Sequence, residues 1–547
     1  MTVLGQSPAS AAYDYPLLIR HLLHTPLAHH SEKEIVYAEG RRFSYPQFRQ
    51  RIGRLASALS GMGIEAGKTV AVLDWDSHRY LECFFAVPML GAVLHTVNVR
   101  LSPEQITYTI NHAEDDLILV HRDFLPLIEQ AKPHIKKPCR VILLTDSDEL
   151  PDTTLEPAGE YETLLGRADP SFHFQDFDEN TRATTFYTTG TTGDPKGVYY
   201  SHRQLVLHTL GIGTCFCIGG DHGGFNSEDV YMPITPMFHV HAWGFPYLAT
   251  LAGVKQVYPG RYAPDRLLSL IEEEKVTFSH CVPTILHMLL QAREQTGTDL
   301  SGWKVIIGGS ALPEGLAAKA LDLGVDLYGG YGLSETCPVL TVARLYNDDL
   351  NKPKSDQVTR RCRAGRPIPL VQLEIVDESG TVLPHDGTST GEVVVRAPWA
   401  TQAYFKEPER SEELWRGGYL HTGDTAFIDD RGYVKVTDRL KDVIKTGGEM
   451  ISSVLLEDIA SQMPEVSEAA AIGIPDEKWG ERPLMLVVAA ADTQLTEVDV
   501  IKHFKQSAAD GMIPNWAVPD QIRVVDAIDK TSVGKINKKA LREKYKG

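Results

Sequence analysis

The residue types best suited to chemistry are concentrated in FYTTGTTGDPKGVYYSHRQ, residues 186–204. The segment combines threonines, glycines and a lysine: Thr188, Thr189, Gly190, Thr191, Thr192, Gly193 and Lys196. Glycines let backbone N–H groups converge on an anion, hydroxyls donate further hydrogen bonds, and a lysine adds positive charge. This pattern predicts a phosphate-binding loop, with a flexible polar loop as the alternative. It is not a Walker A loop, because Pro195 stands where that pattern has glycine.

Three other positions offer groups that could serve a nucleotide. In GYGLSET (330–336), Tyr331 presents a flat face for a purine, and Glu335 is a hard oxygen ligand for Mg²⁺. Asp424 is an acceptor-only carboxylate suited to ribose hydroxyls. Taken alone, each is equally compatible with a solvated surface turn. Lys535 follows Gly534 in a polar loop, where the plain interpretation is one solvated charge among several lysines.

PMFHVHAWGFPY (236–247) is rich in histidine and aromatic residues. His239 and His241 suggest a metal site, but no nearby carboxylate or cysteine completes one. An aromatic-rich run is more often core.

The elements that must position these residues follow an alternating pattern. Buried strands are expected at 69–76, 117–123 and 141–147, with an amphipathic helix at 48–63. Further strands, expected at 279–285, 303–310 and 324–332, end in or near glycines. Strands that alternate with helices predict an α/β fold with largely parallel sheets, and ligands bind at the strand ends of such sheets.

The pattern changes twice farther along the chain. From about 371 to 438, short strands separated by DESG and DDRG predict a small β subdomain. After Arg439, strands and helices predict a compact α+β unit. We therefore expect an N-terminal domain over 1–440 and a C-terminal domain over 441–547. A glycine-rich segment at 214–230 is expected to be a surface loop of unassigned role.

Composition narrows the class of protein. The 547 residues are 43% hydrophobic and 23% charged, which excludes a disordered or fibrous chain. A net charge of −18 disfavours nucleic acid and anionic membrane as partners. Seven scattered cysteines indicate a reducing compartment, with Cys215 and Cys217 expected to be packed small side chains. No secretory signal is visible, and 84–97 is too short to span a membrane, so a soluble cytoplasmic protein is expected.

YTTGTTGDPKG resembles the phosphate-binding motif of the adenylate-forming superfamily, which includes acyl-CoA synthetases, peptide-synthetase adenylation domains and luciferases. Segments similar to that family's other motifs follow in its order: GGSALP (308–313), GYGLSET, GYLHTGD (418–424), DRLKDVIKTGGEMIS (438–452) and TSVGKINKKALR (531–542). The resemblance spans nearly the whole chain. It implies a large N-terminal domain of αβ-layered sheets and a small mobile C-terminal domain.

The resemblance also implies roles for individual residues. ATP or AMP would contact Thr188, Thr189, Gly190, Thr191, Thr192, Lys196, Gly309, Ser310, Gly330, Tyr331, Ser334, Thr336, Asp424, Arg439, Lys441 and Lys445. Thr188 and Glu335 would hold Mg²⁺, and CoA would contact Gly447, Gly448 and Glu449. Lys535, Glu335 and His239 would be catalytic, and Lys441 would lie at the interdomain hinge. Two departures are Asp529-Lys530 where relatives often have proline, and Met450 where some have tryptophan.

FH-x-x-x-W in 236–247 and the segment 93–116 look similar to medium- and long-chain fatty-acyl-CoA synthetases. There Trp243 would gate an acyl pocket that also includes His239 and Gly308. The resemblance implies a ligase that converts a fatty acid, ATP and CoA into acyl-CoA, AMP and pyrophosphate, and a homodimer. The alternatives are a ligase for a short carboxylate such as 3-methylthiopropionate or for an aryl acid, a carrier-loading adenylation domain, and an inactive acyl-nucleotide sensor.

Overall fold

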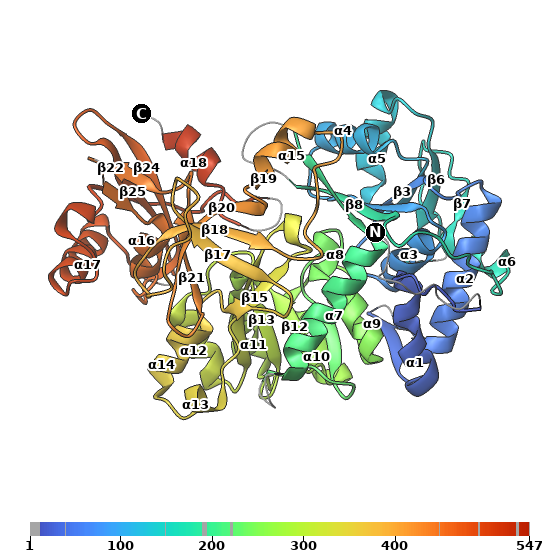
Figure 1. Cartoon of the computed structure of the whole chain (residues 1–547), viewed down its shortest axis with the longest axis horizontal. Coiled ribbons are helices and arrows are strands. Elements are labelled where there is room, and N and C mark those ends of the chain that lie inside the picture. The colour runs from blue at the N-terminus through green and yellow to red at the C-terminus, as the bar shows by residue number, and fades with distance from the viewer. Residues whose placement is uncertain are drawn as a thin grey trace, which may run out of the picture.

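The computed structural model describes residues 11–38, 40–147, 149–188, 194–218, 223–447, 449–490, 493–531 and 535–545. Five of the predicted site residues lie outside the described residues: Thr189, Gly190, Thr191, Thr192 and Gly448. In Figure 1 the chain passes from the blue N-terminal part, through green and yellow elements, to the red C-terminal unit at the opposite end. Within the described ranges, no helix has the length and apolar character needed to cross a membrane.

The first sheet has seven strands in the order β7-β6-β5-β3-β4-β8-β9. Its bounds are β3 Thr69–Leu73, β4 Val93–Thr96, β5 Leu117–His121, β6 Arg140–Leu144, β7 Gly159–Glu160, β8 Arg182–Thr188 and β9 Lys196–Ser201. All neighbours are parallel except β8 and β9, which form an antiparallel pair at the edge. The helices of this part are α2 Tyr45–Gly61, α3 His78–Met89, α4 Pro103–Ala113, α5 Leu125–Ala131 and α6 Tyr161–Arg167.

The second sheet has nine strands in the order β16-β15-β14-β13-β12-β10-β11-β1-β2. Its bounds are β1 Glu34–Tyr37, β2 Arg41–Ser44, β10 Val230–Pro233, β11 Lys255–Tyr258, β12 Phe278–Cys281, β13 Lys304–Ile307, β14 Asp326–Gly332, β15 Val339–Val342 and β16 Arg366–Pro367. The strands from β1 to β14 along this order are parallel. The helices of this part are α1 His24–His29, α7 His202–Ile218, α8 Val240–Trp243, α9 Phe245–Ala252, α10 Pro264–Glu274, α11 Pro283–Thr296, α12 Glu314–Asp322, α13 Asn347–Leu350 and α14 Lys354–Arg361.

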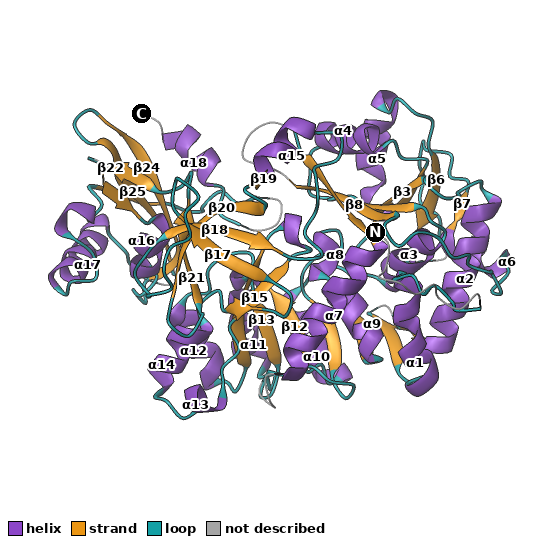
Figure 2. Cartoon of the chain, viewed as in Figure 1, coloured by secondary structure: helices purple, strands orange, loops and turns teal. Residues whose placement is uncertain are grey.

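Two smaller sheets complete the fold (Figure 2). The third is antiparallel and contains β17 Gln372–Val376, β18 Gly391–Arg396, β19 Trp415–Arg416, β20 Tyr419–Ile428 and β21 Val434–Arg439, with α15 Pro408–Leu414 beside it. The fourth contains β22 Ile444–Thr446, β23 Glu449–Ile451, β24 Val466–Asp476, β25 Gly480–Ala489 and β26 Gln521–Val524. Its helices are α16 Ser453–Ala460, α17 Glu497–Ala509 and α18 Lys538–Tyr545. This arrangement confirms the predicted α/β fold class, with a large N-terminal and a smaller C-terminal part.

Packing separates the fourth sheet from the others. The buried residues of the two large hydrophobic clusters in the N-terminal part extend no further along the chain than Val434. The buried residues of two further clusters all lie at or beyond Ile444, and they include residues from β24 and β25 together with α16, α17 and α18. The C-terminal unit therefore has its own core on both faces of its sheet.

Three local predictions need correction. The strand expected at 279–285 ends at Cys281, because Pro283 begins α11, where its missing N–H costs no helical hydrogen bond. The glycine-rich segment 214–230 is not simply a surface loop, since α7 continues to Ile218 and residues 219–222 lie outside the described ones. Cys217 is exposed rather than packed. The predicted helix at 48–63 is confirmed as α2, which starts earlier because Ser44 and Gln47 form a capping box.

Candidate active site

The expected phosphate loop joins β8 to β9. Thr188 ends β8 and pairs in register with Lys196, which begins β9. Both side chains are half-buried. The antiparallel pairing therefore brings the hydroxyl-bearing and lysine ends of the motif side by side, with the intervening 189–193 outside the described residues.

Glu335 is held next to this hairpin by a tyrosine that sequence reasoning missed. The hydroxyl of Tyr404 donates to Oε1 of Glu335 at 2.7 Å. The ammonium of Lys196 lies 4.6 Å from the centre of the Tyr404 ring, within cation–π range. Nothing in the local sequence around Tyr404 singles it out, because its only signal is its tertiary position.

The donor set fits a magnesium ion that is also bound to phosphates. Among the described residues there is no cluster of three or more His, Cys, Asp or Glu that could hold a metal. Mg²⁺ at ATP sites usually takes one or two protein ligands and completes its shell with water and substrate phosphates. Glu335, with Thr188 across the hairpin, has this oxygen-only character.

Three side chains from separate strands form a polar group suited to a ribose. Asp424 on β20 is buried, and it pairs in register with Arg439 at the end of β21. Oδ1 of Asp424 accepts from Nε of Arg439 at 3.0 Å, and Oδ2 accepts from the hydroxyl of Tyr331 at 2.8 Å. Burial and the Asp424 carboxylate raise the pKa of Tyr331, so its hydroxyl stays a donor. Each carboxylate oxygen retains acceptor capacity for a ligand hydroxyl.

The glycine-rich ends of β13 and β14 lie around the same place. Gly308, Gly309 and Ser310 directly follow β13, and Ser310 is exposed. Gly330 lies within β14, next to Tyr331.

Ser334 and Thr336 lie in the short turn that carries Glu335, and hydrogen bonds hold this turn. The Ser334 carbonyl accepts from the hydroxyl of Tyr200 at 2.5 Å. The hydroxyl of Thr336 is buried and donates to the Pro338 carbonyl at 2.6 Å, so its first role here is structural.

Lys535 reaches from the C-terminal unit into the N-terminal part. Its Cε lies 3.5 Å from the position that a Cβ on Gly309 would occupy. Its backbone is tied to Thr531, whose N–H donates to the Lys535 carbonyl at 2.7 Å. Burial, with a smaller effect from Arg439, lowers the pKa of Lys535 to about 8, although Asp424 and Glu335 oppose this shift. The lysine is thus near the carboxylates expected to serve ribose and metal.

A small cavity of about 60 Å³ begins beside Lys535. Its walls include Arg100, Thr235, His239, Trp243, Tyr262 and Lys535. Burial, together with Lys535 and Arg100, lowers the pKa of His239 to about 3, so its imidazole is neutral. The rim of the Trp243 ring would lie 3.0 Å from a Cβ on Gly308, so only glycine fits there without displacing the tryptophan. Arg100 and Tyr262 were missed by sequence reasoning, because each is a single residue in an unremarkable segment.

The segment that carries Trp243 is a left-handed turn. Val240, His241, Ala242 and Trp243 have φ values of +48°, +55°, +47° and +59°. A left-handed residue costs roughly 1–2 kcal/mol for an L-amino acid, so the turn needs support from its surroundings. His241 is buried among aromatic rings, and neither of its ring nitrogens has a hydrogen-bond partner among the residues that the structure describes.

Of the three predicted CoA residues, the two that the structure describes, Gly447 and Glu449, are not among the residues that line this cavity. Gly447 follows β22 and donates its N–H to the Trp479 carbonyl at 2.7 Å, and Glu449 on β23 is exposed. Lys445, predicted to contact the nucleotide, is likewise exposed on β22, where its N–H donates to Glu481. Lys441 is also exposed, but Arg439, Asp424 and Lys196 lie close enough to influence its ammonium, whose pKa is lowered chiefly by partial desolvation.

Known proteins share both parts of this architecture. Residues 23–405 match the family described as AMP-binding enzyme, and residues 455–535 match the AMP-binding enzyme C-terminal domain. The chain belongs to the AMP-binding enzyme family. It is 39% identical to a 3-methylmercaptopropionyl-CoA ligase of Ruegeria pomeroyi, over 97% of this chain and 98% of the relative. It is 40% identical to a long-chain-fatty-acid–CoA ligase of Thermus thermophilus, over 98% and 97%.

Solved structures agree with the fold. ATP-bound MatB from Rhodopseudomonas palustris superposes with a TM-score of 0.82 at 25% identity, over 97% of this AMP-binding enzyme and 99% of that chain. The anthranilate CoA ligase AuaEII, in complex with anthranoyl-AMP, gives 0.85 at 23% identity over 97% and 98%, which shows the fold alone. The predicted superfamily and the predicted reaction class are confirmed: an ATP-dependent, AMP-forming carboxylate–CoA ligase.

Proposed function

We propose that this AMP-binding enzyme activates a short carboxylate, of the size of butyrate or 3-methylthiopropionate. One observation carries the proposal: the cavity beside Lys535 has a volume of only about 60 Å³, and the Trp243 ring in its wall packs closely against Gly308. The chain length is not fixed by relatives, whose names range from 3-methylmercaptopropionyl-CoA to long-chain fatty acids. The medium- or long-chain acid expected from the sequence stays a prediction that requires Trp243 to move.

The side chains support a division of labour in the first step. Glu335 and Thr188 would hold Mg²⁺, which when bound neutralises phosphate charge. Asp424, supported by Tyr331 and Arg439, would accept from the ribose hydroxyls. The substrate carboxylate attacks the α-phosphorus, pyrophosphate leaves, and the ammonium of Lys535 stabilises the negative charge that develops. His239 would contact the acyl group as a neutral imidazole.

In the second step, the CoA thiol attacks the acyl carbonyl and AMP leaves. We assign Gly447, Gly448 and Glu449 to the thiol path, since these residues follow β22 directly beyond the predicted hinge at Lys441. The domain boundary proposed at 440/441 falls between β21 and β22. The C-terminal unit has its own core, which supports a domain that turns as a body between the two steps. A homodimer and a cytoplasmic location also stay predictions.

The test is CoA-dependent turnover with Mg·ATP across acetate, butyrate, 3-methylthiopropionate, octanoate, palmitate and benzoate. The wild type is expected to peak at butyrate or 3-methylthiopropionate. Trp243→Ala is expected to move the peak toward octanoate by about tenfold in relative kcat/KM, since the removed ring frees room for several methylenes. Trp243→Phe serves as the conservative control.

A wild-type peak at palmitate would overturn the short-acid proposal. Pyrophosphate release that does not need CoA would point instead to a carrier-loading enzyme.

A further inference from the structure

Asp76 is a buried carboxylate directly behind the acyl cavity, and no role assigned above uses it. It lies just beyond β3, and only 5% of the residue is exposed. Its carbonyl accepts the N–H of Gly260 at 2.9 Å, so it bridges the seven-stranded sheet to the loop that follows β11 in the nine-stranded sheet. Asp76 therefore stands where the two large sheets meet.

The carboxylate of Asp76 binds one lining residue of the cavity, Tyr262, and the backbone of Met237, which lies between the lining residues Pro236 and His239. Oδ1 accepts the backbone N–H of Met237 at 2.9 Å. Oδ2 accepts the hydroxyl of Tyr262, a cavity-lining residue, at 2.5 Å. The guanidinium of Arg100, also in the lining, is close enough to favour the charged form of Asp76.

The bond to Met237 matters because of the segment that comes directly after Met237 in the chain. Three residues later the backbone enters the left-handed turn that ends at Trp243. Such a turn persists only when its surroundings determine it. Asp76 fixes the entry to the turn, so a change at Asp76 is transmitted to the position of the Trp243 ring.

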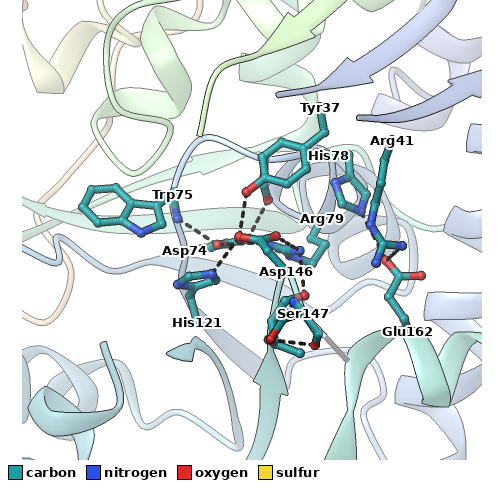
Figure 3. A network of polar contacts seen from close by, with 12 residues as sticks. Tyr37, Arg41, Asp74, Trp75, His78, Arg79, His121, Asp146, Ser147 and Glu162 are labelled. Atoms are coloured by element: carbon teal, nitrogen blue, oxygen red, sulfur yellow. Dashed lines mark hydrogen bonds and ion pairs between the residues drawn. The ribbon is translucent and has the colours of Figure 1, made fainter. Parts of the chain in front are cut away.

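The chain just before Asp76 is held by a network of polar contacts around Asp74, Arg79 and Asp146 (Figure 3). Two residues earlier, Oδ2 of Asp74 accepts from Nε of Arg79 at 3.1 Å. Nη1 of the buried Arg79 also donates to Asp146 at 2.8 Å, and Asp146 accepts from the hydroxyl of Tyr37 at 3.0 Å. This network locks the end of β3, so Asp76 is presented to the cavity walls from a fixed backbone.

We propose that Asp76 is the positioning residue that sets the shape of the acyl cavity and so selects which carboxylate the enzyme accepts. The proposal rests on the proposed function of this cavity. Asp76 does not touch the reacting atoms. It acts through Met237 and Tyr262, and through the electrostatic influence of Arg100.

Charge on Asp76 adds a pH-dependent component to this selection. Burial raises the pKa of Asp76 to about 7, although the bonds from Tyr262 and Met237 and the nearby Arg100 oppose the shift. The titratable and charged groups that face it are Asp74, Tyr80, Arg100, Tyr231, Tyr258 and Tyr262. Above pH 7 the ionised carboxylate accepts from both walls. Below pH 7 the carboxyl group is protonated, and the oxygen that carries the proton becomes a weaker hydrogen-bond acceptor.

The experiment compares butyrate with octanoate as a ratio of kcat/KM, because steps common to both acids cancel in the ratio. Asp76→Asn is expected to change this ratio about tenfold, the scale of losing a charged acceptor, while the KM for ATP changes less than about twofold. In the wild type the ratio is expected to bend near pH 7, and in Asp76→Asn it is expected to be flat.

Asp229 supplies a matched control. It is also 5% exposed, and it lies just before β10, at the opposite end of that strand from the cavity. It pairs with Lys304 at 2.6 Å. Asp229→Asn is expected to lower the melting temperature while leaving the butyrate-to-octanoate ratio unchanged. An equal change of the ratio in Asp76→Asn and Asp229→Asn would overturn the proposal, because the change would then reflect a general loss of stability and not the contacts of Asp76.

A second readout does not need turnover. The dissociation constants of butyryl- and octanoyl-sulfamoyladenosine, which are stable acyl-adenylate analogues, are measured by calorimetry for wild type and Asp76→Asn. A ratio that moves with the kinetic ratio supports the proposal, and an unchanged ratio overturns it. If the wild type binds the octanoyl analogue more tightly than the butyryl analogue, and Asp76→Asn still shifts the ratio, the proposed preference for a short acid fails alone. If neither analogue binds the wild type, the cavity is not an acyl cavity and both proposals fall.

Discussion

At the proposed nucleotide end of the site, Asp424 pairs directly with Tyr331 at 2.8 Å and with Arg439 at 3.0 Å, and the second pair is set by the register of β20 and β21. At the acyl end, the cavity walls come from segments far apart in sequence and meet through backbone bonds and ring packing. In the proposed function, the first end binds ATP, which is the same in every reaction, through charged groups. The second end selects the acid, which can vary, through the shape of its cavity. We therefore expect changes at the first to alter rate or ATP use, and changes at the second to alter choice of acid.

The largest expected effect is on the rate of the adenylation step, and not on ATP binding or on the choice of acid. Lys535→Ala should slow acyl-adenylate formation about 100- to 1000-fold, because one preorganised donor is worth ~2.7–4 kcal/mol in the transition state. Thioester formation from supplied acyl-adenylate should persist. Pyrophosphate release and thioester formation, measured separately, check this.

Lys530→Ala is the matched control for this change, since Lys530 pairs with Glu468 at 2.7 Å and is expected to leave both steps intact. An equal loss of both half-reactions in Lys535→Ala would show that the lysine is not specific to adenylation.

The next largest effect is expected on the KM for ATP, when only the proposed nucleotide end is changed. Asp424→Ala removes the partner of Tyr331 and Arg439, so the KM for ATP should rise roughly 10- to 100-fold, the scale of a lost charged hydrogen bond. The order of preference among acids should not change. Initial rates at varied ATP with several acids check both points.

Asp429→Ala serves as the control for Asp424→Ala, because it removes a carboxylate just after the same strand, where Asp429 pairs with Arg363. It should alter stability rather than the KM for ATP. A changed acid preference in Asp424→Ala would mean that the two ends are not separable.

A third effect follows from the lowered pKa of Lys535. A lysine with a pKa of about 8 loses its positive charge as pH rises through 8, so adenylation should fall about tenfold per pH unit above that value. In Lys535→Arg this alkaline limb should move to higher pH, because arginine stays charged. Pyrophosphate release with saturating ATP from pH 6 to 10 measures it, and an identical limb in both proteins would assign it to another group.

The smallest effect concerns Tyr404. Tyr404→Phe keeps the ring next to Lys196 and removes only the hydrogen bond to Glu335. We therefore expect the Mg²⁺ concentration needed for half-maximal activity to rise about 3- to 10-fold. Titration of Mg²⁺ at fixed ATP checks this. Tyr346→Phe, an exposed tyrosine, is the control.

The same contrast explains how much could be predicted from the sequence. The proposed nucleotide end lies in contiguous motifs, so roles for Glu335, Asp424 and Lys535 could be predicted from the resemblance of those motifs to a known family. Strands such as β3 and β5 were predictable because they are continuous apolar runs bounded by turns. The places of Asp76 and Arg100 in the site could not be predicted, because no local sequence pattern indicates that their side chains support or line a cavity. Pro283 shows a second limit of prediction from sequence. The apolar run at 279–285 was predicted to be one strand, but its last part belongs to a helix that begins at this proline.

Lys535 lines the cavity, and in the proposed mechanism it also stabilises charge during the first step. A side chain that closes the cavity cannot stay in place while reactants enter and products leave. The proposed mechanism therefore requires substrates to enter before the C-terminal unit docks and products to leave after it moves away. Each catalytic cycle would then include a movement of the C-terminal unit away from the cavity. Higher solvent viscosity should slow this movement even where every chemical step is fast.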